Sequence, residues 1–446
     1  MLKYRYDYHQ SFVYKIFCAS KSGETPTTFE EALEIIKGIY NMSLGMKLIV
    51  YLVGWQHEGH DSKYPDWREF NERLKRNCDK TTRDSFLWLC QQAKAYNCVV
   101  SVHVNMCDAY ENSPLWHEYS EKDLLVREND GSLRKGSLWG GEQAYLVSKT
   151  REWQSGYAQK RLDELIELLL LEEAGTLHID VFEPYDNPYH GITHEDDFES
   201  MKKIVSYLNL RGIDVTKEWF HAELLGMIPM VYHLNFDEAQ RLAYPPDVIC
   251  GGGSMWNLRR LDRAKVPPWQ GFFIRPSSGC LYDRAWGESF DYDLHMNQKD
   301  VDWIENETEG FRSNFYLKTI PWYYLNRLNI IRHTHSSEQY SVEFDGGHIS
   351  TIDISNGRYS LYNQDRIFVD GDNIFMPALW SETNQWIMYS HVGGLQEWNA
   401  PKGWTEFEIY LPDKDGEKFI GQVDVINGKI KLRLEPRQSM VLRQKT

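Results

Sequence analysis

The segment LHIDVF, residues 177–182, places the carboxylate of Asp180 in the middle of an apolar, strand-like run. A second run, IDVTKEW at residues 213–219, places Glu218 near a strand end, 218 − 180 = 38 residues later. This spacing suits one β-helix-β unit, because a parallel crossover needs about a dozen residues or more. A buried carboxylate is costly unless something pairs with it or uses it. The two runs therefore predict neighbouring parallel strands that carry two acids to one rim of a sheet.

Strand-like and helix-like segments alternate through the first three-quarters of the chain. This alternation predicts a (β/α)8 TIM-type barrel over residues 1–335, with its site at the carboxyl ends of the strands. We expect its strands at 12–19, 47–55, 98–105, 143–148, 177–182 and 213–219, with weaker candidates at 247–250 and 271–274. We expect helices at 28–42, 82–96, 152–173 and 198–211.

The rhythm of the sequence changes after about residue 336. Helical periodicity disappears, and short alternating runs separated by Gly and Asn/Asp turns take its place. Such runs are typical of antiparallel sheets. We therefore expect a C-terminal antiparallel β-sandwich over residues 336–446, following the catalytic barrel.

The composition excludes several classes of partner. The net charge of −16 argues against nucleic acid and against anionic membranes, since both need a basic face. Aromatic residues make up 14% of the chain, which leaves rings available for sugar stacking. The 7 cysteines are odd in number and form no C-x-x-C pair, so we expect reduced thiols and no zinc site. The N-terminal residues carry no apolar signal-peptide core, which predicts a cytoplasmic protein.

Asp180 and Glu218 are the candidate catalytic pair. Asp180 should point opposite to its apolar neighbours, and Glu218 should share a face with Thr216, because side chains alternate along a strand. Each acid also has a plain structural interpretation: an internal ion pair for Asp180 and a capped turn for Glu218. Paired carboxylates at one rim beside aromatic rings are typical of glycoside hydrolases.

The loop GWQHEGHDS, residues 54–62, is the richest polar cluster in the chain. Trp55 could stack on a sugar ring, while Gln56 and Asp61 could bind its hydroxyl groups. A metal site formed by His57, Glu58, His60 and Asp61 is the rival interpretation. The loop does not contain the helical His-Glu-x-x-His pattern, so we favour the sugar-binding interpretation and expect no metal and no cofactor.

Three further polar side chains are candidates for the site. His103 and Asn105 alternate with valines in CVVSVHVN, residues 98–105, so both should face one way into the barrel mouth. A satisfied core histidine is the common alternative for a single His. Gln270, between Trp269 and Gly271, lies at the start of a weak candidate strand.

These motifs together resemble glycoside hydrolase family 101, the endo-α-N-acetylgalactosaminidases, and more distantly family 129. The residues that carry the resemblance run from about residue 45 to the C-terminus: GWQHEGHDSKYPD at 54–66, VHVN at 102–105, the Asp180 strand, TKEW at 216–219, WQG at 269–271 and YSHVGGLQEWNAPKGW at 389–404. The 54–66 loop is the most specific of them. Lys217 departs from the family pattern, which has Thr between the residues equivalent to Thr216 and Glu218.

The resemblance implies a retaining α-glycosidase with an N-acetylgalactosamine pocket. By this resemblance Asp180 matches the nucleophile and Glu218 the general acid/base. Asp61, His103 and Gln270 match sugar contacts, and Trp139 in GSLWGG, residues 136–141, matches a lid tryptophan. The chain lacks the large flanking modules of mucin-degrading members.

We therefore expect a carbohydrate substrate and a double-displacement mechanism on O-glycan core 1 or GalNAc-α-Ser/Thr linkages. An exo-acting α-glycosidase of other specificity is one alternative. A non-catalytic carbohydrate-binding protein on the same fold is another, and a metal-dependent hydrolase is a third. The sequence leaves the oligomeric state open.

Overall fold

The first domain is built on eight parallel strands. The computed structural model describes residues 4–25, 27–234, 238–251, 295–296, 312, 315–353 and 355–445. The sheet has the order β10-β9-β8-β7-β3-β2-β1-β11, and each pair is parallel. Its strands are β1 (Phe12–Phe17), β2 (Leu48–Val53), β3 (Cys98–Asn105), β7 (Thr176–Asp180), β8 (Asp214–Trp219), β9 (Met230–His233), β10 (Cys250–Gly251) and β11 (His295–Met296).

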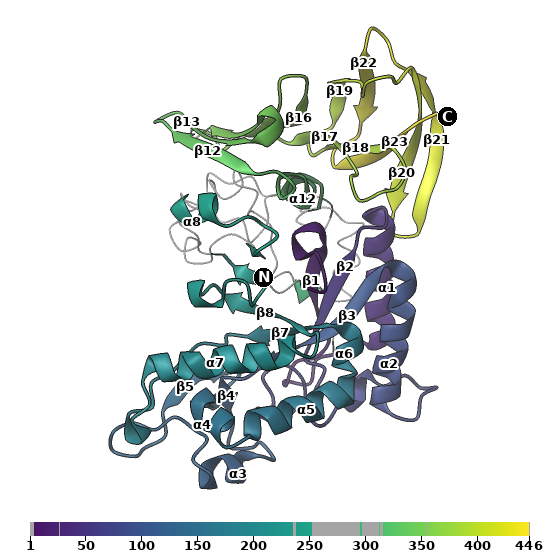
Figure 1. Cartoon of the computed structure of the whole chain (residues 1–446). Coiled ribbons are helices and arrows are strands. Elements are labelled where there is room, and N and C mark those ends of the chain that lie inside the picture. The colour runs from purple at the N-terminus through teal and green to yellow at the C-terminus, as the bar shows by residue number, and fades with distance from the viewer. Residues whose placement is uncertain are drawn as a thin grey trace.

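This strand order is that of a TIM-type barrel. Strands that follow one another in the sequence lie side by side, and β11 returns to pair with β1. The sheet is curled, and helices pack against its outer side (Figure 1). Apolar residues of the strands and of these helices form the core. In the described part of the chain up to residue 251, the helices are α1 (Phe29–Met42), α2 (Thr82–Ala93), α3 (Trp116–Glu121), α4 (Lys149–Gln154), α5 (Tyr157–Leu169), α6 (Leu171–Ala174), α7 (His194–Asn209) and α8 (Glu238–Ala243).

Capping residues set the starts of three of the outer helices. Thr28 accepts a hydrogen bond from the Glu31 backbone, and the Glu31 carboxylate reaches back to the Thr28 N–H, which forms a capping box. Equivalent boxes begin α2 at Thr81 and α7 at Thr193. Such caps satisfy backbone N–H groups that have no partner within the helix. The expected start of the first helix is confirmed, and α7 begins earlier than expected because its cap is Thr193.

One expectation about the barrel strands is corrected by the structure, and one further strand was not expected. Residues 143–148 do not form a barrel strand, because β6 (Glu142–Leu146) belongs to a separate sheet with β4 (Asp108–Ala109) and β5 (Lys135–Trp139). Strand β9 was not expected, because its four residues are too short to show a pattern.

The expected helix at 152–173 is divided among α4, α5 and α6, with left-handed breaks at Gly156 and Leu170. The candidate strand at 271–274 lies outside the described residues.

The second domain is a large antiparallel assembly. Ten strands form a sheet in the order β12-β13-β14-β15-β16-β17-β18-β23-β20-β21, and β19 pairs with β22 beside it (Figure 1). Their bounds are β12 (Ile330–His335), β13 (Gln339–Phe344), β14 (His348–Asp353), β15 (Tyr359–Tyr362), β16 (Ile367–Asp370), β17 (Asn373–Pro377), β18 (Gln385–Ser390), β19 (Gly394–Asn399), β20 (Glu406–Asp413), β21 (Gly416–Asp424), β22 (Lys429–Leu434) and β23 (Gln438–Gln444).

The two domains contact each other directly. They are connected by a π-helical turn, Phe315–Thr319, and by α12 (Ile320–Leu325). The Trp380 indole N–H donates to the Ser43 carbonyl at 2.7 Å, and the Asn41 amide donates to the Lys414 carbonyl at 2.8 Å. Both contacts place the C-terminal domain over the end of α1 (Figure 1).

Among the described helices none is long and apolar enough to cross a bilayer.

Gly54 provides a test of how the loop after β2 is held. Its φ is +76°, and a Cβ there would lie 2.0 Å from the Ala19 carbonyl oxygen. We predict that Gly54→Ala lowers the free energy of unfolding by about 3 kcal/mol, because backbone must move and a left-handed conformation is strained. Urea unfolding followed by tryptophan fluorescence measures this change.

Gly428→Ala is the matched control for this prediction. Gly428 also has a positive φ, +71°, but nothing lies within 4 Å of the position that a Cβ would occupy there. Gly428→Ala should lower the free energy of unfolding only by the strain of a left-handed alanine, about 1 kcal/mol. Equal destabilisation by the two substitutions would show that the contact with Ala19 does not hold the loop.

Candidate active site

The strand register places the two candidate acids side by side. Asn105 of β3 lies opposite Asp180 of β7, and Ile179 lies opposite Lys217 of β8. The next pair along β7 and β8 is therefore Asp180 and Glu218. His178 Nδ1 and Thr216 Oγ1 are 3.0 Å apart, so these two side chains share the inner face of the barrel. Because side chains alternate along a strand, Asp180 and Glu218 point the same way.

Asp180 is held by polar groups on the neighbouring strands. The His103 Nε2 atom lies 3.6 Å from its Oδ2, and the Asn105 amide donates to the same oxygen at 3.5 Å. Burial by itself would raise the pKa of Asp180, but the adjacent His103 ring and the positive charge of Lys15 lower it well below its usual range. Burial lowers the pKa of His103. The site therefore holds an ionised carboxylate at neutral pH.

Two further carboxyl groups surround Asp180 and are harder to ionise. Burial and then the charge of Asp180 raise the pKa of Asp61 to about 6. Burial and then the charges of Asp61 and Asp180 raise the pKa of Asp108 to about 7. Like charges in one buried site cannot all be carried at low cost. Asp180 is thus the first of these three carboxyl groups to lose its proton as the pH rises.

Asn105 connects this cluster to the chain that follows β3. Its Oδ1 accepts hydrogen bonds from the backbone N–H groups of Cys107 and Asp108, at 2.7 Å and 2.9 Å. Its amide donates to Asp108 Oδ2 at 2.9 Å as well as toward Asp180. The amide is therefore fixed in one orientation, with its donor hydrogens directed at carboxylates.

Two residues of the 54–62 loop lie beneath the site. Trp55 is fully buried, and its indole N–H donates to the His103 carbonyl at 3.1 Å. The stacking role expected for Trp55 is therefore corrected: the ring has no exposed face, because it packs against Phe70 and supports β3. Gln56 is also buried and donates to the Gly59 carbonyl at 3.3 Å, which braces the loop that carries Asp61.

The remaining candidates lie at the edge of the site or outside the described residues. Trp139 is 42% exposed at the end of β5. The Lys21 ammonium donates to the Trp139 carbonyl at 2.5 Å and to the Asp61 carbonyl at 3.3 Å, so it links the β5 hairpin to the 54–62 loop. Gln270 lies outside the described residues.

The rival metal site would need the side chains of the 57–61 loop to converge. Instead, His57 faces Asp66 and Glu69, Glu58 faces Lys63, and His60 faces Asp61. Within the described ranges, the three potential ligands that come within 4.8 Å of one another are His103, His178 and Asp180. These belong to the carboxylate site itself, where they surround the candidate nucleophile.

Several residues of the site were not expected from the sequence. Lys15 is 2% exposed, and its ammonium lies 4.2 Å from the centre of the Tyr232 ring. His233 lies near Glu218, with Nε2 3.9 Å from Oε1. A lysine in the middle of the apolar strand FVYKIF was a usable signal, because a charge in a buried strand needs a partner. Asp108 and His233 gave no such signal, because Asp108 lies just after β3 and His233 ends the short strand β9.

Comparison with known proteins finds one matching family and several structures of similar fold. Residues 6–227 match the model of the endo-alpha-N-acetylgalactosaminidase family, glycoside hydrolase family 101. This span contains both Asp180 and Glu218. These matched residues make up about half of the chain, which is thus similar to this family of glycoside hydrolases.

Solved structures resemble the chain in fold. Ligand-free alpha-N-acetylgalactosaminidase NagBb from Bifidobacterium bifidum has a TM-score of 0.57 and 15% identity, over 79% of this chain and 57% of that chain. The same protein in its GalNAc complex has a TM-score of 0.54 and 14% identity, over 79% and 57%. The chain thus spans a little over half the length of these proteins. A comparison with curated proteins finds no match.

A strained turn follows Asp180. Val181 and Phe182 both have left-handed backbones, with φ of +53° and +52°. Such a conformation is unfavourable for a β-branched residue and persists only where the surroundings impose it. Phe182 is fully buried, and the next residue, Glu183, is 3.3 Å from the buried Lys217 ammonium. The turn after β7 is thus tied to β8, the strand that carries Glu218.

Lys217, Glu183 and His221 form a closed triangle. The Lys217 ammonium donates to His221 Nδ1 at 2.8 Å, and His221 Nε2 lies 3.1 Å from Glu183 Oε2. Burial and then the Lys217 charge lower the pKa of His221 to about 3, so this ring is neutral. A neutral ring can accept at Nδ1 while Nε2–H donates to Glu183. Lys217, the residue that departs from the family pattern, therefore has a defined structural role.

The ionisation of Lys217 gives this triangle a pH dependence. Burial lowers the pKa of Lys217 from 10.5 to about 8, and Glu183 opposes this shift. A lysine with a lowered folded-state pKa destabilises the fold while it is protonated, and the cost disappears as pH rises from about 8 to 10.5. Removing Glu183 should lower the pKa of Lys217 further.

We predict that Glu183→Ala destabilises the protein by about 2 kcal/mol at pH 6.5, because a buried ammonium loses its counter-charge. The deficit should shrink at pH 9.5, where Lys217 is neutral in both proteins. Urea unfolding at the two pH values measures it. Glu199→Ala is the control, since its exposed pair with Lys202 should contribute less than about 0.5 kcal/mol at either pH. A Glu183→Ala deficit independent of pH would refute the role assigned to the Lys217 charge.

Proposed function

We propose that this hydrolase cleaves α-linked N-acetylgalactosamine with retention of configuration, as a double-displacement enzyme. The observation that carries the proposal is the adjacent placement of Asp180 and Glu218 on one face of β7 and β8. In this mechanism Asp180 attacks the anomeric carbon while Glu218 donates a proton to the leaving oxygen. Glu218 then removes a proton from the water that releases the sugar from Asp180.

The strand geometry supports retention over inversion. Neighbouring strands lie about 4.8 Å apart, so two carboxylates on one row and one face are held at a short separation. Retaining enzymes place their carboxyl groups about 5–5.5 Å apart, whereas inverting enzymes need about 6.5–9.5 Å to admit a water. The lowered pKa of Asp180 supports its role as nucleophile, because a nucleophile must be ionised when the substrate binds.

The surroundings of Asp180 support a sugar pocket. Asp61 and His103 lie beside the nucleophile, with Asn105 on the same strand as His103. Together they provide acceptors and donors in a partly enclosed rim, which suits the hydroxyl groups of a pyranose. Trp139 lies at the edge of the 54–62 loop, where an exposed ring is available to close over a bound sugar.

The α-N-acetylgalactosaminide specificity rests on the family match and on the fold shared with an alpha-N-acetylgalactosaminidase. We propose O-glycan structures, either core 1 or GalNAc-α-Ser/Thr, as the natural substrates. We propose that the catalytic domain ends near residue 329, slightly before the expected boundary at 335/336, because β12 (Ile330–His335) pairs with β13 in the antiparallel sheet. Release of disaccharide from aryl Galβ1-3GalNAcα would identify endo action, and release from aryl α-GalNAc alone would identify exo action.

We predict that Asp180→Asn lowers kcat/KM on these aryl glycosides by at least about a thousandfold while the protein stays folded, because an amide cannot attack the anomeric carbon. Hydrolysis assays and circular dichroism measure the two effects. Proton NMR of the first product should show the α-anomer. A β-anomer as first product, or substantial activity in Asp180→Asn, would contradict the proposed mechanism.

Glu218 has a distinct expected signature. Glu218→Ala should hydrolyse substrates with poor leaving groups very slowly, because no acid protonates the departing oxygen. Added azide should restore turnover of an activated aryl glycoside, since azide attacks the sugar–Asp180 intermediate without a general base. Glu195→Ala, on the first turn of α7, is the control and should leave the rates unchanged. Asp197→Asn cannot serve as this control because Asp197 is fully buried.

A further inference from the structure

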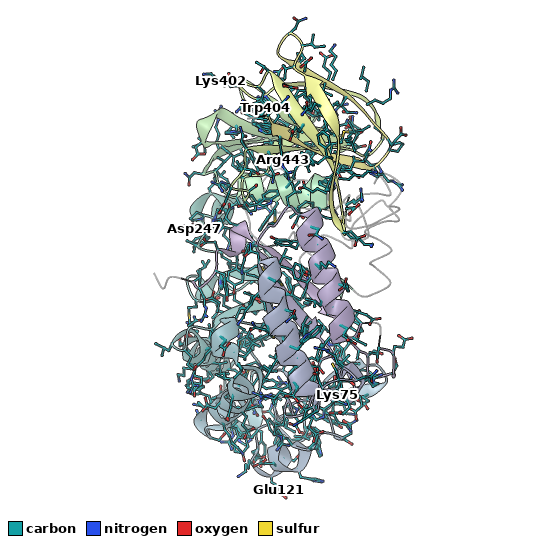
Figure 2. All side chains as sticks on the ribbon, turned by 90° about the vertical axis from the view of Figure 1, so that its right-hand side faces the viewer. Lys75, Glu121, Asp247, Lys402, Trp404 and Arg443 are labelled. Carbon is teal, nitrogen blue, oxygen red and sulfur yellow. The ribbon has the colours of Figure 1, made fainter. Side chains whose placement is uncertain are left out.

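The C-terminal domain contains a second concave site, separate from the barrel rim. It is a cavity of about 620 Å³ between α12, the β15–β16 hairpin, the start of β18 and the Pro401–Lys402 loop. This volume is in the range of small-ligand sites. Figure 2 shows Lys402 at the outer edge of the C-terminal domain, at the opposite end of the molecule from Glu121. None of the residues that line this cavity belongs to the Asp180 cluster.

Aromatic rings form a rigid wall of this cavity. The Tyr324 and Phe368 ring centres are 5.0 Å apart, and the Phe368 and Trp386 rings are nearly parallel, at 6.4 Å and 9°. Phe368 and Trp386 are buried, and Tyr324 is half-buried. Phe368 packs against the half-buried Tyr324, and the exposed part of the Tyr324 ring offers an apolar surface against which the C–H groups of a sugar can lie.

Arg366 is held in place against this wall. Its guanidinium lies 4.4 Å from the Trp386 ring centre, and its Nη2 donates to the Ala400 carbonyl at 2.8 Å. Its Nη1 atom is buried and has no hydrogen-bond partner among the described residues. A guanidinium positioned by a ring and a carbonyl needs little ordering to bind an anion, and its planar fork matches a carboxylate. Burial lowers the pKa of Arg366, yet it stays protonated.

The charges around the cavity are predominantly positive. Arg327, Arg366 and Lys402 line it with one carboxylate, Asp365. In the part of the chain that the structure describes, none of the three cations has a carboxylate within 4.0 Å. This concentration of unpaired cations contrasts with the net charge of −16 for the whole chain. An uncharged ligand would leave these cations without a counter-charge.

We propose that this cavity binds an acidic sugar, with its carboxylate on Arg366 and Lys402 and its ring against the aromatic wall. Asn363 and Asp365 supply the donor and acceptor that hydroxyl groups need. A nucleotide is the other ligand that combines an anion with an apolar face. The structure favours the sugar because Arg366 already covers a face of Trp386, where a flat base would stack. The site would hold an acidic glycan at a distance from the catalytic rim.

Isothermal titration calorimetry of the whole protein at low salt tests this proposal. The probes are 3′-sialyllactose, lactose as its neutral counterpart, and AMP. We expect 3′-sialyllactose to bind, lactose to bind at least tenfold more weakly, and AMP to give no signal at the same concentration. Raising the salt concentration should weaken 3′-sialyllactose binding severalfold, because the contact is ionic.

Three variants locate the binding. Arg366→Gln and Lys402→Ala should each weaken 3′-sialyllactose binding, Arg366→Gln by at least tenfold, while hydrolysis of aryl glycosides stays unchanged. Lys402 is exposed, so that variant tests the site even if Arg366→Gln folds poorly. Lys418→Ala, exposed on β21 at the far edge of the sheet, is the matched control and should stay within twofold of wild type.

The contradicting results are equally specific. Equal affinity for lactose, tighter binding of AMP, or no binding of any probe up to millimolar concentration would each overturn the acidic-sugar site. Binding that survives both Arg366→Gln and Lys402→Ala would place the ligand elsewhere. Because hydrolysis is measured on the same proteins, loss of the second site remains distinguishable from failure of the proposed catalytic mechanism.

Discussion

The charge of Asp180 is the constraint around which the barrel rim is organised. An ionised carboxylate in a largely buried position is stable only if donors and cations surround it. His103 and Asn105 supply these from β3, and Lys15 supplies a positive charge from β1. The register of three parallel strands is therefore fixed by polar contacts as well as by apolar packing. A shift of one residue would turn these side chains to the helical face.

The same constraint extends to the outer side of the strands. The backbone leaves β7 through two left-handed residues, Val181 and Phe182, which a relaxed chain would not adopt. The buried Lys217–Glu183 pair and the burial of Phe182 hold this turn against β8. Because Lys217 and Glu218 are adjacent, the contact that positions the turn after Asp180 and the candidate acid/base belong to one strand. Rigid support of this kind is what precise catalytic geometry requires.

The C-terminal domain contributes a different kind of site. Its cavity combines an aromatic wall with cations that have no internal counter-charge, whereas the barrel rim combines carboxylates with polar donors. The contacts of Trp380 and Asn41 fix the domain on the end of α1. The molecule thus presents an acidic rim and a basic cavity on domains that pack directly against each other.

Some of this could be predicted from the sequence, because it depends on local patterns. Alternation of strand-like and helix-like segments predicted the barrel, and period-2 alternation placed Asp180, Glu218, His103 and Asn105 on one face.

Tertiary structure decided what depends on distant partners. It placed residues 143–148 in a side sheet and buried Trp55 beneath β3. It also brought Lys15, Asp61 and Asp108 around Asp180, and Arg366 onto Trp386. Electrostatic fields and ring contacts depend on distances between remote residues, so only the folded chain determines them.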